Sequence, residues 1–180
     1  RFELTSAAIP GKHTITVRVH NGKEENPPIG GNHQVNDGTQ TNWNGILGDI
    51  QISATDKIWI EQVKVYPDID KKSARVNIIF GNSDNTTFSG KVTLSAQSWN
   101  SSHVHTVNPL VCNIEGNGIN NMFEFTLPMG DAVQLWSEFN PTLYRLAVNF
   151  EGKSKKTKIT GRKDVNFGMR KFHTIGTSFA

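Results

Sequence analysis

His103 and His105 come closest, by type and spacing, to the beginning of a metal site. They are separated by one residue in the segment SHVHT, so on an extended strand both imidazoles would point to the same side. A closed zinc site needs about four protein ligands and a catalytic one about three, whereas no third ligand lies nearby in the sequence. We expect two structural histidines, and neither a metal ion nor another cofactor.

Nucleophilic catalysis finds little support in the chain. The single cysteine, Cys112, lies between apolar residues in PLVCNI, with no neighbouring histidine or basic pair to activate its thiol. There is no GxSxG motif, and PPIGG at 27–31 is not followed by a helical pattern that could hold a phosphate. We expect a buried structural thiol and no catalytic residue.

Two tryptophans could contact sugars, and two asparagines stand in glycosylation-type sequences. Trp99 and Trp136 could stack on sugar rings, but a tryptophan also buries a large apolar area while its N–H finds a partner near an edge. We therefore interpret both as core or corner residues. The glycosylation-type sequences NTT at Asn85 and NSS at Asn100 predict exposed loops.

The charge of the chain is concentrated in one segment. The net charge is +3, and the densest basic cluster is GKSKKTKITGRK at 152–163. This cluster contains no aromatic residue that could stack on bases, so it favours a solvated hairpin and argues against a nucleic-acid partner. No run approaches the ~18 apolar residues of a membrane span, and we expect a soluble chain without a membrane partner.

Period-two alternation recurs along the chain and helical periodicity is almost absent, which predicts an all-β fold. The expected strands are 58–66, 74–80, 91–99, 103–113, 121–127, 142–150 and 164–173. About seven short strands with regular turn signals are typical of an immunoglobulin-like β-sandwich. The parity slip in IWIEQVKVY predicts a bulge or a change of partner, and 74–80 with 91–99 suggests a hairpin-like pair.

The composition changes before Ile58. The segment HTITVRV alternates like a strand, whereas residues 21–49 are rich in Gly, Asn, Pro, Asp and Gln. An irregular stretch of that length is too long for an ordinary connection and indicates a functional loop. We place a domain boundary near Asp56, with one domain at 1–56 and the sandwich at 57–180.

Three stretches carry motifs that can be compared with a known family. They are NWNGILGDIQISATDKIWIEQVKVYPDID, LWSEFNPTLYRLAV and VNFGMRKFHT. In this order they resemble glycoside hydrolase family 2, the family of β-galactosidase, β-glucuronidase and β-mannosidase. The family patterns are W-x-x-G-I, L-W-S-P-x-x-P-x-L-Y and F-G-F-R; Glu138 stands where a proline is usual, and Met169 replaces the second phenylalanine. IPGKHTITVRVHN also resembles a family strand, with His13 in an asparagine position.

The resemblance implies that residues 1–56 are the C-terminal part of a jelly-roll sugar-binding domain. It also implies that the family's TIM barrel, with its acid and nucleophile glutamates, is missing from these 180 residues, as is the rest of the jelly roll. A barrel needs about 250 residues, and retaining hydrolysis needs two carboxylates about 5 Å apart. We expect that this chain alone hydrolyses nothing.

The resemblance assigns the sugar-binding positions to Asp49, Trp43 and Asn44. In related β-galactosidases the corresponding aspartate reaches into the barrel and holds galactosyl hydroxyls, while Trp43 would pack beneath the loop. Gly48 departs from the family, which usually has arginine there. A strand-end turn cap is the alternative role for Asp49.

Two functions follow as alternatives. The first is a non-catalytic sugar-binding and scaffold fragment of a β-galactosidase-like enzyme that hydrolyses terminal β-linked sugars. The second is an autonomous carbohydrate-binding or adhesion module, which would need several exposed aromatics, whereas the pattern turns most aromatics inward. Unpaired strand edges in residues 1–56 predict a possible homo-oligomer, and the habit of the family suggests a periplasmic or secreted location.

Overall fold

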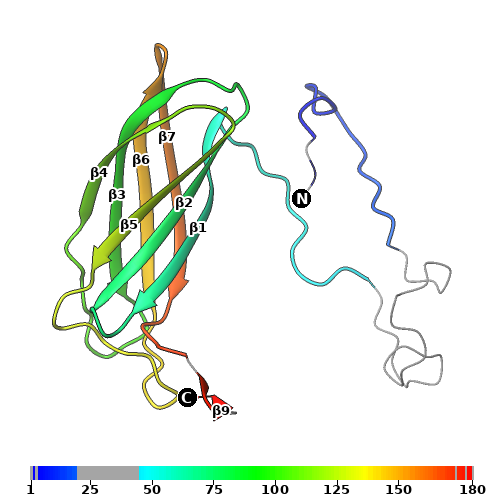
Figure 1. Cartoon of the computed structure of the whole chain (residues 1–180). Coiled ribbons are helices and arrows are strands. Elements are labelled where there is room, and N and C mark those ends of the chain that lie inside the picture. Colours follow the sequence, from blue (N-terminus) through cyan, green and yellow to red (C-terminus); the bar gives the residue numbers. More distant parts are fainter. Residues whose placement is uncertain (1, 3, 20–44, 173, 177, 180) are drawn as a thin grey trace, which may run out of the picture. The chain divides into compact units, whose positions relative to one another are not determined.

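The computed structural model describes residues 2, 4–19, 45–172, 174–176 and 178–179 (Figure 1). The chain divides into two compact units, Arg1–Ile52 and Ser53–Ala180, and each is described by itself. In the described part of the chain, no helix is long and apolar enough to cross a membrane.

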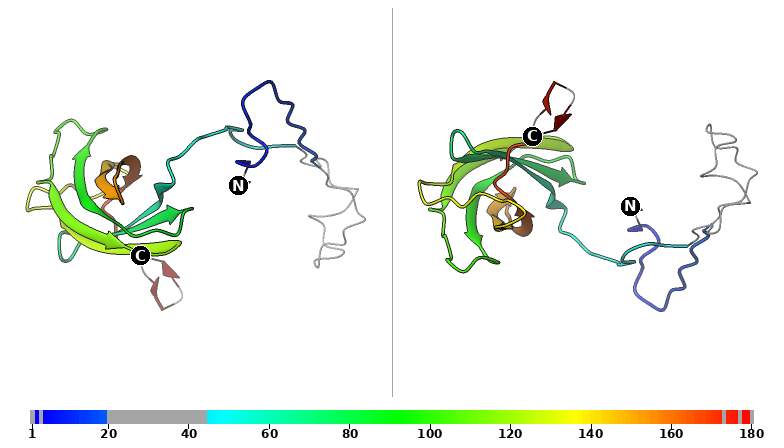
Figure 2. Two further views of the ribbon diagram at one scale, coloured as in Figure 1. Left: turned by 90° about the horizontal axis from the view of Figure 1, so that it is seen from above. Right: turned by 90° about the horizontal axis from the view of Figure 1, so that it is seen from below.

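The second unit is a two-layer antiparallel sandwich. Its strands are β1 (Ile58–Asp68), β2 (Ser73–Asn82), β3 (Phe88–Ser98), β4 (Leu110–Gly116), β5 (Asn120–Pro128), β6 (Tyr144–Ser154) and β7 (Thr157–Phe167). The three-stranded sheet has the order β1-β2-β5 and the four-stranded sheet the order β4-β3-β6-β7; Figure 2 shows the two layers end-on. A short separate pair joins β8 (Thr174–Ile175) to β9 (Ser178–Phe179). The all-β sandwich of seven strands is confirmed.

Alternating apolar side chains build the core between the sheets, because successive residues of a strand point to opposite faces. The inward residues of β2 are fully buried, as are those at the centre of β6. Phe80 of β2 contacts Phe88 of β3 and Phe150 of β6 at centroid distances of 5.5 and 5.0 Å. Edge and tilted contacts of this kind stabilise a core beyond its buried area, and they fasten the two sheets together.

The predicted irregularity in the first strand is a β-bulge. The β1–β2 register shifts between Ile60 and Gln62. The extra residue, Glu61, restores the inward orientation of Val63, which is 9% exposed. A bulge of one residue is what the parity slip requires.

The bounds of two predicted strands and one predicted strand pairing are wrong. The strand expected at 103–113 begins only at Leu110, with an isolated bridge from Gln97 to Thr106 before it. The strand expected at 164–173 is β7, which begins at Thr157; its inward side includes Gly161 and Lys163, so apolar periodicity does not reveal it. β2 and β3 do not pair as a hairpin, because residues 83–87 cross from one sheet to the other.

The first unit contains no strand among its described residues, 2, 4–19 and 45–52. The strand predicted for HTITVRV is therefore absent here, and Ile15, Val17 and Val19 are at least half exposed. An alternating segment needs a neighbour for its backbone and a second layer for its apolar side. The jelly-roll origin of residues 1–56 stays a prediction.

Candidate functional site

The sugar-binding assignment made from sequence stays a prediction, because only one of its three residues is among the described residues. Asp49 is exposed on the irregular segment 45–57, and Trp43 and Asn44 lie outside the described residues. Gly48 has φ 94°, a value that side-chain-bearing residues rarely adopt. The arginine usual in the family would be strained in this conformation.

The second and third family motifs meet at one end of the sandwich, which we call the corner end (residues 99–109, 129–143 and 168–172). The Trp136 amide donates to the Met169 carbonyl at 2.9 Å, and the Arg170 guanidinium lies 4.6 Å from the centre of the Trp136 ring. Met169, which stands in the position of a family phenylalanine, is fully buried. The two motifs form one structural unit.

Tyr144, at the start of β6, anchors this corner. Its hydroxyl accepts the Gln134 amide N–H at 2.9 Å and bonds His105 Nδ1 at 2.7 Å, while its ring stacks on Phe167 at 5.6 Å. Burial raises the pKa of the Tyr144 hydroxyl above its ordinary value. A buried tyrosine that bonds to upstream backbone is the tyrosine-corner arrangement of immunoglobulin-like sandwiches.

Tyr144→Phe is expected to lower the free energy of unfolding by about 2 kcal/mol, because it leaves the Gln134 amide and the His105 ring without their partner. Urea denaturation of the chain measures this loss. Tyr66→Phe is the matched control, because the Tyr66 ring is 41% exposed on the outer face of β1. An equal loss for both variants would show that the Tyr144 hydroxyl does not hold the corner.

The other residues singled out from the sequence are two histidines, a cysteine and an asparagine. His103 is exposed and His105 half-buried, and no group of metal-binding side chains occurs within the described ranges. Cys112 is free but only half-buried, so full burial was wrong. Asn100 is exposed as predicted, yet its side chain bonds the Pro141 carbonyl and the Leu143 amide at 2.6 Å each.

Sequence reasoning missed Asn100 and Gln134 as the residues that join the loops of the corner end. Besides its backbone bond to Tyr144, Gln134 donates its side-chain amide to the His103 carbonyl at 2.6 Å. No periodicity or motif marks either role, because each bond links loops that are distant in the chain.

Trp99 and Trp136 do not form an open sugar platform. Trp99 is 49% exposed, but the Arg145 guanidinium lies 5.5 Å from its ring centre. The Trp136 ring is likewise covered by Arg170, at 4.6 Å. Most other rings in the sandwich face the core, as the alternation predicted. This geometry disfavours an autonomous module that binds sugars by stacking.

The carboxylates of the described residues do not form an acid–base pair of the kind that hydrolysis needs. None of the buried side chains in the described part of the chain is acidic. The pKa of Asp68 is lowered by the Lys71 backbone amide, and that of Asp131 by a hydrogen bond from Lys72. A glycosidase acid needs a raised pKa, so both shifts are in the wrong direction for this role.

The seven strands and the tyrosine corner define the class of this domain as an immunoglobulin-like sandwich. Residues 58–170, which span β1 to β7, match the sequence model of glycosyl hydrolases family 2. The chain belongs to this family.

A solved structure of the same family shares the fold. A family 2 glycosyl hydrolase from Bacteroides cellulosilyticus is similar with a TM-score of 0.51 and 17% identity over 66% of this chain and 16% of its own. β-Glucuronidase 2 from Bacteroides uniformis gives a TM-score of 0.45 and 19% identity over 70% of this chain and 15% of its own. The chain thus spans about a sixth of these proteins. No curated protein sequence matches it.

Proposed function

We propose that this chain is a non-catalytic scaffold and sugar-contact part of a β-glycosidase that acts on terminal β-galactosides. The observation that carries the proposal is the family match over 58–170, which falls on a sandwich whose interior holds no acidic side chain among the described residues. Such a domain positions other elements and performs no hydrolysis itself.

In this proposal the sandwich is a rigid support for the segment that carries Asp49. The Asp49 carboxylate would accept hydrogen bonds from galactosyl hydroxyls, a charge-assisted interaction. Hydrolysis would take place between two glutamates of a TIM barrel, for which 180 residues are too few. The partners are therefore a β-linked carbohydrate, the barrel and the rest of the jelly roll.

Activity measurements test the assignment. The 180-residue chain and the longest reading frame that contains it would each be assayed with nitrophenyl β-galactoside, β-glucuronide and β-mannoside. We expect the short chain to be inert and the long one to prefer the galactoside. Preference for the glucuronide would overturn the galactoside assignment, and turnover by the short chain would overturn the non-catalytic role.

Asp49→Asn in the long protein is expected to lower kcat/KM for the galactoside by at least about tenfold, because a hydrogen bond to a charged group is lost. Asp56→Asn is the matched control, since Asp56 is also exposed on 45–57. Equal kinetics for both variants would assign Asp49 to a turn cap.

Self-association is a further part of the proposal. Ile15, Val17 and Val19 are exposed with strand-like spacing, and an exposed segment with this spacing can pair with a second copy. Light scattering of the chain is expected to show a concentration-dependent dimer. A monomer at every concentration would exclude pairing between copies.

A further inference from the structure

The β6–β7 hairpin carries lysines that the fold leaves without acidic partners. Lys153, Lys155, Lys156 and Lys158 are all exposed, and none of them forms an ion pair with a described residue. Six other cations of the described chain do form such pairs, for example Lys171 with Asp70 at 2.7 Å. The positive charge of this hairpin is therefore available to an anionic ligand.

Two features of the hairpin oppose stability and so call for another explanation. Lys153 and Lys158 are directly opposite each other in the β6–β7 register, and like charges in that position are destabilising. Lys155 has φ 54°, where glycine or asparagine is the usual residue. Local rules are broken in this way mainly at functional sites.

An open depression of about 500 Å³ lies beside these lysines. Its rim includes Lys153 and Lys155, one carboxylate, Glu115, and a set of hydroxyl and amide side chains. These are Asn85, Thr86, Thr87, Ser89 and Asn117. The aromatic ring in the lining, Phe88, is 1% exposed, so recognition here would rely on hydrogen bonds and charge.

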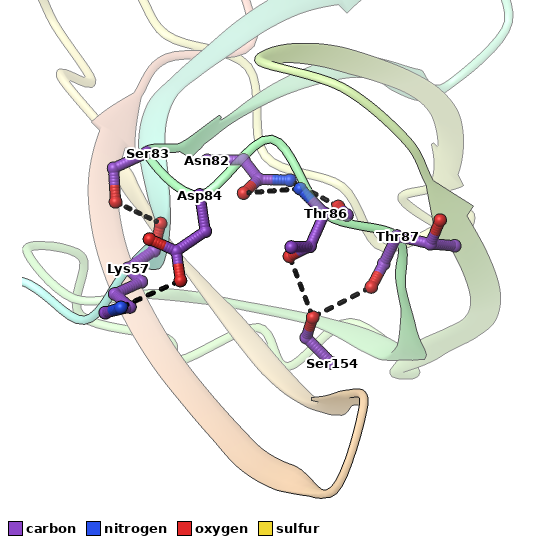
Figure 3. Close-up of polar contacts among 7 residues, drawn as sticks. All are labelled: Lys57, Asn82, Ser83, Asp84, Thr86, Thr87 and Ser154. Atoms are coloured by element: carbon purple, nitrogen blue, oxygen red, sulfur yellow. Dashed lines mark hydrogen bonds and ion pairs between the residues drawn. The ribbon is translucent and has the colours of Figure 1, made fainter.

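Hydrogen bonds fix the β2–β3 connection that forms one wall (Figure 3). Asn82 is buried and its side-chain amide donates to the Thr86 carbonyl at 2.6 Å and the Gly118 carbonyl at 3.0 Å. The Ser154 hydroxyl bonds that of Thr86 at 2.9 Å and donates to the Thr87 carbonyl at 2.8 Å. The wall is thereby tied to the hairpin and held in place before any ligand arrives.

We propose that this depression, together with the hairpin lysines, binds an anionic polysaccharide. Amide and hydroxyl groups suit sugar hydroxyls, and ammonium groups suit the carboxylate or sulfate of an acidic sugar. A single-stranded nucleic acid fits less well, because it needs exposed rings on which its bases can stack. The site would hold a polymer near the enzyme and depends neither on Asp49 nor on catalysis.

Titration calorimetry of the full chain tests the site with dextran sulfate, polygalacturonate, neutral dextran and a single-stranded DNA. We expect binding to at least one anionic polysaccharide, weaker at about 0.15 M than at about 0.02 M salt. The polymer bound more tightly tells whether sulfate or carboxylate is preferred. No binding to either, equal binding to neutral dextran, or binding to the DNA as tight as to the polysaccharides would overturn the proposal.

Variants distinguish specific binding in the depression from nonspecific attraction to the positive charge of the chain. Lys153→Gln with Lys155→Gln is expected to weaken binding about tenfold, whereas Lys64→Gln with Lys71→Gln removes the same charge elsewhere and should have little effect. Asn85→Gly keeps every charge and suits the φ of 51° at this position; it should weaken binding about threefold. Equal losses in both double variants, or unchanged binding by Asn85→Gly, would reduce the site to diffuse attraction and overturn it.

The conflict between stability and binding at Lys155 gives a further prediction. Lys155→Gly is expected to raise Tm by about 3 °C, because it relieves the positive φ, and to weaken polysaccharide binding. Differential scanning calorimetry and titration of the same sample measure both effects. A lower Tm, or a higher Tm with unchanged binding, would contradict a binding role for this lysine.

Discussion

Replacing Phe150 with alanine should lower the free energy of unfolding of the sandwich by about 4 kcal/mol, the cost of removing a buried aromatic ring and leaving a cavity. The ring is 1% exposed and makes edge contacts with Phe80 and Phe88 at centroid distances of 5.0 and 5.9 Å. Because Phe80 belongs to the other sheet, the cavity would lie between the two layers, where neither sheet can close it alone.

Phe139→Ala is the control for this prediction. Phe139 is 92% exposed in the β5–β6 connection, so its truncation should change the free energy by no more than about 0.5 kcal/mol. Urea denaturation of both variants, followed by tryptophan fluorescence, gives the comparison. A loss below about 2 kcal/mol for Phe150→Ala would show that the core collapses around the missing ring.

Much of the fold could be predicted from sequence, because each strand of the sandwich has one side that faces solvent and one side that faces the core. The strand predicted at 74–80 has Ala74, Val76, Ile78 and Phe80 in alternate positions, and all four are fully buried. The prediction failed for β7, where Gly161 and Lys163 occupy inward positions; the Lys163 ammonium donates to the Glu61 carbonyl at 2.6 Å. A polar group bonded inside the sheet cannot be recognised from hydrophobic periodicity.

It was harder to predict which strands pair than to predict where strands occur. Residues 74–80 and 91–99 are close in sequence and alternate cleanly, yet β2 and β3 lie in different sheets. The choice between a hairpin and a crossover depends on the loop and on which sheet offers a partner, and neither is encoded in alternation. The same reason explains HTITVRV, whose pattern alone cannot supply a neighbouring strand.

The candidate site was predictable only in part. Family resemblance selected Asp49, Trp43 and Asn44, but the described structure gives an exposed position for Asp49 alone. The contacts of Tyr144 are set by the fold, because its hydroxyl meets a backbone amide 10 positions away and a histidine 39 positions away. The lysine cluster was visible in sequence. The register of the sheet was needed to show that Lys153 lies opposite Lys158, beside a depression.

Gly90→Ala is expected to destabilise the sandwich by about 3 kcal/mol, although it adds a single methyl group. Gly90 of β3 is directly opposite Gly152 of β6. A Cβ at position 90 would lie less than 3 Å from the Glu151 carbonyl oxygen, the Gly152 Cα and the Phe150 ring. Two of these neighbours are backbone, so the strands would have to separate, and overpacking of this kind costs several kcal/mol.

Gly81→Ala provides a matched comparison, because the nearest neighbours of its added Cβ are atoms of the Trp59 ring. In a Trp59→Ala background the cost of Gly81→Ala should therefore vanish, since alanine suits a strand better than glycine. In a Phe150→Leu background Gly90→Ala should keep most of its cost, because the backbone contacts remain. Double-mutant cycles in urea measure both couplings. Relief of the Gly90→Ala cost by Phe150→Leu would show that the phenylalanine ring, and not the approach of the two strands, requires glycine at position 90.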